Sequence, residues 1–141
     1  MTPPIGRDQT PGGEEADLIW NRALKRSHDP RLAGDKALTR ALRFHSSAMS
    51  GGVLETVERT EDADLDAAQS GYRWLGLGVV AEIIDRVRRA INDGSLDDDD
   101  RAGELEESAA SDYNSLIPAD AALETAFRQR LAQEPDAFDS T

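Results

Sequence analysis

The 141-residue chain contains no cysteine, which excludes a disulfide framework, a thiolate zinc site and a cysteine nucleophile. Its first residues, MTPPIGRDQTPGG, lack the apolar run of a signal peptide. No stretch approaches the roughly 18 consecutive apolar residues that indicate a membrane span. We therefore expect a soluble, cytoplasmic protein that has no membrane partner.

Histidine is scarce as well, with only His28 and His45 available as a general base for nucleophilic catalysis. His28 falls in a predicted turn and is expected at the surface. His45 falls on an apolar helical face and is expected in or beside the core, with its hydrogen bonds satisfied. No paired-histidine metal motif and no calcium-loop spacing occurs, and the glycines at 76–78 have neither a preceding strand nor a following lysine. We expect a non-enzymatic protein without a metal or cofactor.

Acidic residues, in contrast, are abundant, and the net charge is −12. The balance is +2 over residues 1–50, which hold eight basic and six acidic side chains. It is −14 over residues 51–141, which hold eight basic and 22 acidic side chains. Such a chain is repelled by nucleic acid and by anionic membranes, so direct binding to nucleic acid is not expected and basic proteins are the expected partners. Two alternatives are that the charge only maintains solubility or reflects adaptation to high salt.

Apolar side chains recur at the three- and four-residue spacing of helices, and no segment alternates as a strand does. Helical patterns occupy residues 14–27, 35–50, 53–60, 65–71 and 72–91, a stretch that starts near Asp99 or Asp100, and a last stretch before Pro135 in which Leu123, Ala126, Phe127 and Leu131 face inward. This predicts an all-α, single-domain bundle of six or seven helices over residues 14–138. A flexible leader over 1–13 and a tail over 139–141 flank it.

The stretch Tyr72–Ile91 is apolar on most of its circumference, which predicts one continuous central helix buried on several sides. The residues expected to face the core are Trp74, Leu77, Val79, Val80, Ile83, Ile84, Val87 and Ile91. Gly76 and Gly78 predict close packing of a neighbouring backbone, since each costs about 1 kcal/mol against alanine in a helix interior. Three arginines at 86, 88 and 89 are expected to neutralise part of the acidic segment that follows.

Three local features predict how the helices begin and end. Asp35 is expected to be the N-cap of its helix. The pair Gly51-Gly52 is expected to end that helix through a positive φ. Phe138 is expected to fold back as an anchor.

Two groups of carboxylates carry the functional interpretation. The first, here the acidic run, comprises Asp97, Asp98, Asp99, Asp100, Glu104, Glu106 and Glu107. The second acidic cluster comprises Glu58, Glu61, Asp62, Asp64 and Asp66. Adjacent carboxylates about 6 Å apart repel by roughly 0.7 kcal/mol per pair in water, so such groups are either tolerated solvated surface or a binding surface. Because duplex DNA carries one charge per about 1.7 Å, carboxylates along helix faces could imitate it.

Three segments resemble the bacterial DNA-mimic protein family over roughly residues 35–138: RFHSSAMSGGVLETVE, GYRWLGLGVVAEII and SDYNSLIPADAALETAFRQRLAQEPDAF. The shared features are Gly51-Gly52 after a helix, a central apolar helix, Asp112-Tyr113 after an acidic stretch, and a last helix that ends in Pro135 and Phe138. The chain departs from the family at Ser50, where relatives often carry asparagine, and at Val53 and Leu54, where they often carry aromatic residues.

The resemblance implies an all-helical, acidic, dimeric protein whose carboxylates occupy the DNA site of a transcription factor. Our first hypothesis is that the acidic run and the second acidic cluster bind a basic DNA-binding protein. One alternative is an immunity or antitoxin protein that plugs the basic cleft of a toxin nuclease. Another is a helical domain whose acidity serves solubility alone.

Overall fold

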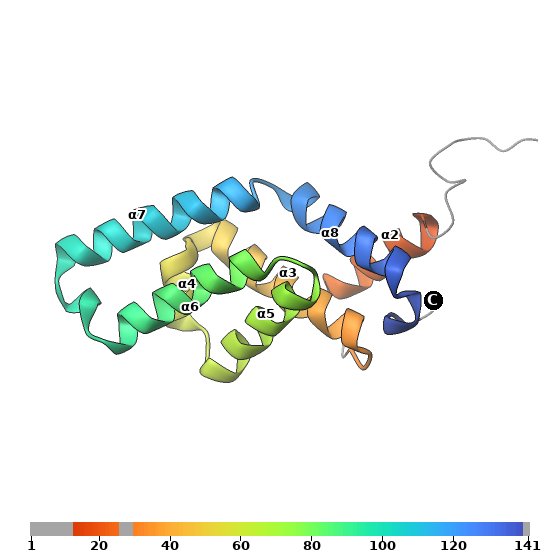
Figure 1. Cartoon of the computed structure of the whole chain (residues 1–141), viewed down its shortest axis with the longest axis horizontal. Coiled ribbons are helices and arrows are strands. Elements are labelled where there is room, and N and C mark those ends of the chain that lie inside the picture. Colours follow the sequence, from red (N-terminus) through yellow and green to blue (C-terminus); the bar gives the residue numbers. More distant parts are fainter. Residues whose placement is uncertain (1–12, 26–29, 140–141) are drawn as a thin grey trace, which may run out of the picture.

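The computed structural model describes residues 13–25 and 30–139, and within these ranges it contains helices and no strand (Figure 1). The described residues form seven α-helices, α2 (Gly13–Ala23), α3 (Ala33–Gly51), α4 (Val53–Arg59), α5 (Asp62–Trp74), α6 (Gly78–Asn92), α7 (Asp99–Leu116) and α8 (Asp120–Gln133), with short 3₁₀ helices η1 (Ser95–Asp97) and η2 (Pro135–Ala137). The predicted all-α bundle is confirmed. His28, residues 140–141 and the expected leader, apart from Gly13, lie outside the described residues.

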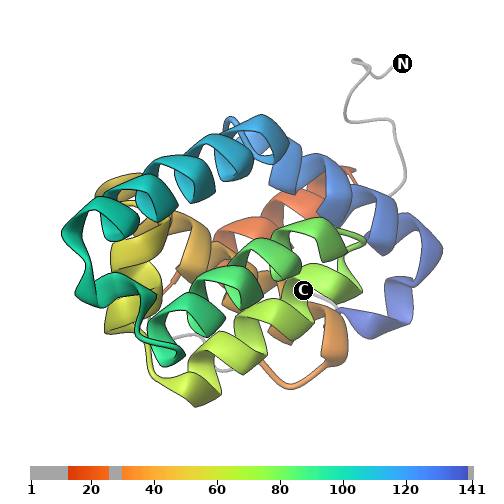
Figure 2. The ribbon, with the colours of Figure 1, turned by 60° about the vertical axis from the view of Figure 1, so that its left-hand side comes forward.

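The apolar stretch Tyr72–Ile91 is not one helix, and this prediction is wrong. The chain leaves α5 after Trp74, turns at Gly76 with φ +84°, and enters α6 at Gly78. Consequently α5 and α6 form a helical hairpin whose arms lie side by side in both ribbon views (Figures 1 and 2). The predicted helical piece over 65–71 is the middle of α5. The turn lets both arms face the same core.

The core is one cluster of buried apolar side chains to which every α-helix contributes. Figure 2 shows the α5–α6 hairpin against α3, with α4 and α7 covering one end and α2 and α8 the other. Of the side chains expected to face inward from residues 72–91, Val80, Ile83, Ile84 and Val87 are buried. Val79 is 57% exposed, so its predicted inward orientation is wrong. In α8, all four predicted core residues are buried, as expected.

Glycine permits a close contact between α3 and α5 and sharp turns of the backbone. A Cβ at Gly71 would lie 2.7 Å from the carbonyl oxygen of Ala37, so α3 and α5 approach closely there. The close approach predicted at Gly76 and Gly78 is wrong, because nothing lies within 4 Å of a Cβ at either position. Gly52 has φ +93° between α3 and α4, which confirms the predicted break.

Asp35 connects the two ends of the described chain instead of capping a helix. The helix α3 begins at Ala33, and Asp35 is buried inside its first turn. Its carboxylate accepts hydrogen bonds from Arg22 Nη2 at 2.8 Å and from the backbone N–H of Asp139 at 2.7 Å. Phe138 beside it is 5% exposed, so the predicted anchor is confirmed. In the part of the chain that the structure describes, no helix combines the length and apolarity that crossing a membrane requires.

Candidate acidic binding surface

Local side-chain chemistry starts α7 where the sequence predicts. The carboxylate of Asp98, the N-cap, accepts a hydrogen bond from the backbone N–H of Asp100 at 2.9 Å. Asp99 and Asp100 occupy the first turn, where the helix dipole favours negative charge by about 0.3–1 kcal/mol per residue. The first acids of the run therefore help to form the helix that carries the others.

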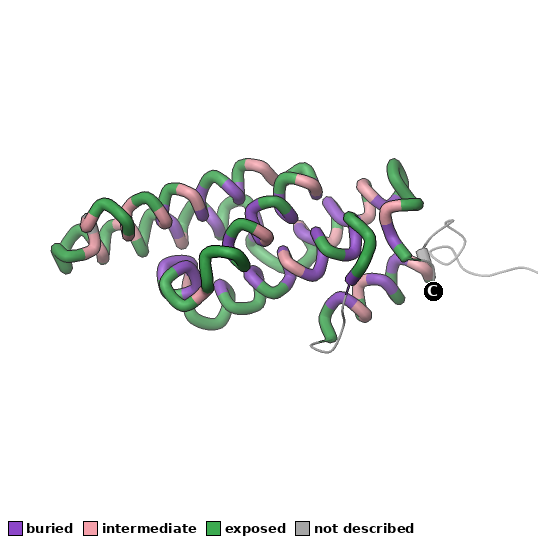
Figure 3. The backbone as a smooth tube through the Cα atoms, turned by 90° about the horizontal axis from the view of Figure 1, so that it is seen from below, coloured by how far each residue is buried: buried purple, intermediate pink, exposed green. Residues whose placement is uncertain are grey.

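Few side chains of α7 pack against the rest of the bundle. Within the helix only Ala109 and Tyr113 are buried, and Leu105 is half-buried. Both buried residues lie in the C-terminal half, whereas the tube in Figure 3 is largely green toward the start of the helix. The first half of α7 is thus an exposed extension that is held to the bundle on one narrow side.

All seven carboxylates of the acidic run belong to exposed residues. None of them makes an ion pair with a residue that the structure describes, and neither does Arg101, the one base among them. Within α7, from Asp99 to Glu107, the chain advances about 12 Å at the helical rise of 1.5 Å per residue. The five carboxylates of the run that α7 carries correspond to about one charge per 2.4 Å, against about 1.7 Å for duplex DNA.

The arginines near the end of α6 do not pair with the acidic run. Of the acidic segment that follows them they neutralise only Asp112, through Arg86, so the expectation is met at that residue alone. They pair with other carboxylates: Arg86 with Asp112 at 2.8 Å, Arg88 with Asp66 at 2.7 Å and Asp62 at 3.4 Å, and Arg89 with Asp85. The pKa of Arg88 is raised, chiefly by its hydrogen bond to Asp66. Arg86 and Arg88 thus link α6 to α7 and α5, whereas Arg89 pairs within α6.

The structure divides the second acidic cluster into three parts. Asp62 and Asp66 are held by Arg88 and act in the fold. Asp64 lines a cavity between α3, α4 and α5. Glu58 and Glu61 are exposed and have no ion pair among the described residues. Since α4 packs against α7, Glu58 belongs to the end of the molecule that carries the acidic run (Figures 1 and 2).

A buried hydrogen-bond network fixes the C-terminal half of α7. The hydroxyl of Tyr113 lies 2.7 Å from Nδ1 of His45 and 3.0 Å from the hydroxyl of Tyr72. Nε2 of His45 lies 2.8 Å from a carboxylate oxygen of Asp120, the first residue of α8. Burial raises the pKa of Tyr113 to about 12 and that of Tyr72 well above its usual value.

This network confirms the prediction of a core histidine with satisfied hydrogen bonds. His45 is 2% exposed, and both of its ring nitrogens have a partner, so acting as a base would require breaking one of these bonds. The sequence offered no signal for the partners, because Tyr113 and Asp120 lie 68 and 75 positions away along the chain. The network ties α3 to α5, α7 and α8.

Comparisons of the chain with protein-family models, with curated proteins and with solved structures find no match. Among the described residues, no group of three or more histidine, aspartate or glutamate side chains is arranged to hold a metal ion. Function is therefore inferred from the residues and their geometry.

Proposed function

We propose that this chain is a non-enzymatic binding protein whose acidic run occupies the DNA-binding site of a basic partner protein in place of duplex DNA. One observation carries the proposal: between Asp97 and Glu107 all seven carboxylates of the run are exposed, and none makes an ion pair with any described residue. Arginines close in sequence pair with other acids instead. The negative charge of the run is therefore available to a binding partner and is not used in ion pairs within the fold.

Two physical features support the comparison with DNA. Along α7 the run has about one carboxylate per 2.4 Å, which approaches the charge density of a duplex, so lysines and arginines spaced to contact phosphates would meet carboxylates at comparable intervals. The helix that carries five of the seven carboxylates is anchored in the bundle at its other end by the hydrogen bond of Tyr113 to His45, so its direction is fixed before a partner binds. Pre-organisation of this kind lowers the entropic cost of association.

The proposal also specifies how the protein acts. The chain works in the cytoplasm, binds neither nucleic acid nor membranes itself, and associates quickly because opposite charges steer the encounter. The homodimer that the family resemblance implies would present two acidic runs. Glu58 on α4 and Glu61 at the N-cap of α5 would extend the surface, whereas Asp62 and Asp66 stay with Arg88.

The test is capture of partners from an extract of the source cells at low salt, with four asparagines replacing Asp97–Asp100. The matched control replaces Glu14, Glu15 and Glu82 with glutamine and Asp136 with asparagine. None of these four acids makes an ion pair with a described residue, and both variants have a net charge of −8, from −12 + 4. We expect the wild type and the control to retain a DNA-binding protein that the asparagine variant loses.

Purified partner is then challenged with its DNA duplex and with added salt. Displacement by the duplex and a steep loss of affinity with salt are the expected results. Retention of the partner by both variants would place the contact outside the run. Capture of a toxin nuclease would favour the immunity or antitoxin alternative, and the lack of any salt-sensitive partner would favour a helical domain whose acidity only serves solubility.

A further inference from the structure

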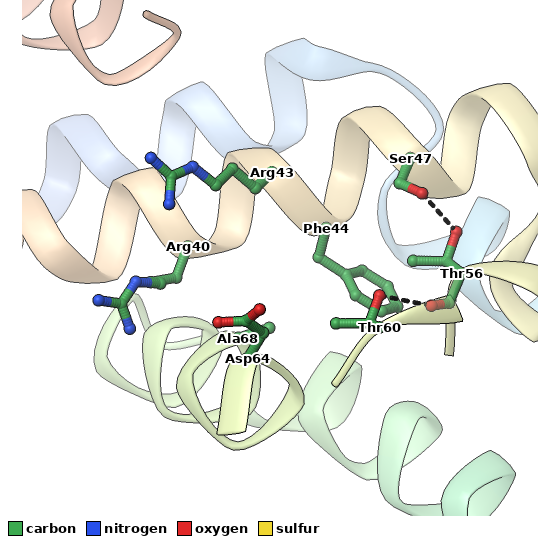
Figure 4. Close-up of a pocket in the computed structure, with 8 residues that line it drawn as sticks. All are labelled: Arg40, Arg43, Phe44, Ser47, Thr56, Thr60, Asp64 and Ala68. Atoms are coloured by element: carbon green, nitrogen blue, oxygen red, sulfur yellow. Dashed lines mark hydrogen bonds between the residues drawn. The ribbon is translucent and has the colours of Figure 1, made fainter. Parts of the chain in front are cut away.

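A cavity of about 140 Å³ lies between α3, α4 and α5, and no residue of the acidic run lines it (Figure 4). Its lining residues are Arg40, Arg43, Phe44, Ser47, Thr56, Thr60, Asp64 and Ala68. We propose that this cavity binds a small zwitterion, with a carboxylate at the arginines and an ammonium group at the hydroxyl oxygens and Asp64. The proposal does not depend on the function proposed for the acidic run.

Two guanidinium groups form one end of the cavity. Arg40 and Arg43 stand three residues apart on α3, a spacing that places them on one side of the helix. Both side chains extend to the same end of the cavity in Figure 4. Neither makes an ion pair or hydrogen bond with a described residue, although the chain has 28 acidic and 16 basic side chains. Paired guanidiniums are suited to a carboxylate, which they bind through parallel N–H donors.

The opposite end presents hydrogen-bond acceptors. The hydroxyl of Thr56 donates its proton to the carbonyl of Gly52 at 2.8 Å, so Ser47, 3.0 Å away, must donate to Thr56. Thr60 donates to the carbonyl of Thr56. Each hydroxyl has one proton, and all three protons are used inside the protein, which leaves only lone pairs for a ligand. Asp64 has no hydrogen-bond partner among the described residues, and its carboxylate lies between Arg40 and Thr60 in Figure 4, so it adds a negative charge between the two ends.

Apolar groups separate the two ends. The ring of Phe44, which is 4% exposed, lies between the arginines and the hydroxyl groups of Ser47 and Thr56 in Figure 4, and Ala68 adds a methyl group. An engineered cavity of about 150 Å³ holds benzene, so a ligand of that size fits. A short ω-amino acid has the required carboxylate, apolar chain and ammonium. Inorganic phosphate is disfavoured, because a doubly charged anion would be repelled by Asp64.

The experiment is calorimetric titration of the full chain with 4-aminobutyrate, butyrate, butylamine and inorganic phosphate. We expect 4-aminobutyrate to bind at least about tenfold more tightly than each of the others, a difference of about 1.4 kcal/mol. Replacing Arg40 and Arg43 with alanine should remove this binding. The matched control replaces Arg31 and Arg73, two exposed arginines outside the cavity that have no partner among the described residues, and should bind normally.

Thermal unfolding of each variant separates lost binding from lost structure. If the Arg40/Arg43 variant unfolds early, Ser47→Ala provides the second test, because it removes one acceptor from an exposed position and should also weaken binding. If butyrate binds as tightly as 4-aminobutyrate, the proposed binding of the ammonium group by the hydrogen-bond acceptors is wrong. Tighter phosphate binding, or no binding of 4-aminobutyrate in the millimolar range, would overturn the proposal as a whole.

Discussion

Replacing Asp97, Asp98, Asp99 and Asp100 together with asparagine is expected to leave the free energy of unfolding within about 1 kcal/mol of the wild-type value. These carboxylates have no ion pair to lose among the described residues, and asparagine at position 98 can still cap α7. If the acidic run does not stabilise the fold, removing its charge should change the free energy of unfolding only slightly.

The magnitude follows from opposing terms. Each adjacent pair repels by roughly 0.7 kcal/mol in water and about half of that at physiological salt. Neighbours in sequence remain neighbours after unfolding, so most of this repulsion cancels between the two states. Loss of the favourable helix dipole at Asp99 and Asp100 costs about 0.3–1 kcal/mol each. Relief of repulsion from the later acids of the run partly offsets that cost.

A second variant provides the contrast, because it removes acids that are paired. Asp62→Asn with Asp66→Asn deprives Arg88 of both carboxylate partners, and the Arg88 side chain is only 18% exposed. We expect a loss of about 0.5–2 kcal/mol, the sum of two surface ion pairs.

Urea unfolding followed by circular dichroism, at low and at physiological salt, measures both variants. Added salt should stabilise the wild type, with a net charge of −12, more than the Asp97–Asp100 variant, with −8. A loss above about 2 kcal/mol in that variant would refute the reasoning, because it would show that the acidic run stabilises the fold.

Three further predictions concern the bundle. Gly71→Ala should lose about 1–3 kcal/mol of stability in urea unfolding, since its Cβ would lie 2.7 Å from a backbone oxygen. Gly103→Ala on exposed α7 should instead gain up to about 1 kcal/mol. Equal effects of the two substitutions would contradict the close approach of α3 and α5. Gly76→Ala should lose about 1–2 kcal/mol in the same measurement, because φ +84° strains any L side chain, and an unchanged midpoint would disprove this. Stability should fall from about pH 10, where unfolded tyrosines ionise, toward pH 12, because the pKa of Tyr113 is about 12 and that of Tyr72 is also raised. Each tyrosine lowers the free energy of unfolding by about 1.4 kcal/mol per pH unit in this window. Urea midpoints measured against pH should therefore decline less steeply in Tyr113→Phe than in the wild type.

Helix content and several helix ends could be predicted from sequence alone, because they depend on neighbours within one or two turns. The start of α7 at Asp99, the break at Gly52 and the inward side of α8 follow from cap chemistry, backbone freedom and apolar spacing. The exposure of the acidic run belongs with them, since consecutive carboxylates have no low-energy place inside a core.

The position of the turn within residues 72–91 and the partners of the ion pairs depend on tertiary packing and could not be predicted from the local sequence pattern. The apolar period of residues 72–91 continues across Gly76, and only the antiparallel packing of α5 on α6 determines that the chain turns there. The same packing brings Arg88 to Asp66, 22 positions away, and so leaves the acidic run without its expected cations. Ion pairs and buried networks depend on distance in space, which local periodicity does not encode. The sequence alone therefore determined that this protein is helical and acidic, whereas the tertiary structure decided which of its charges remain for a partner.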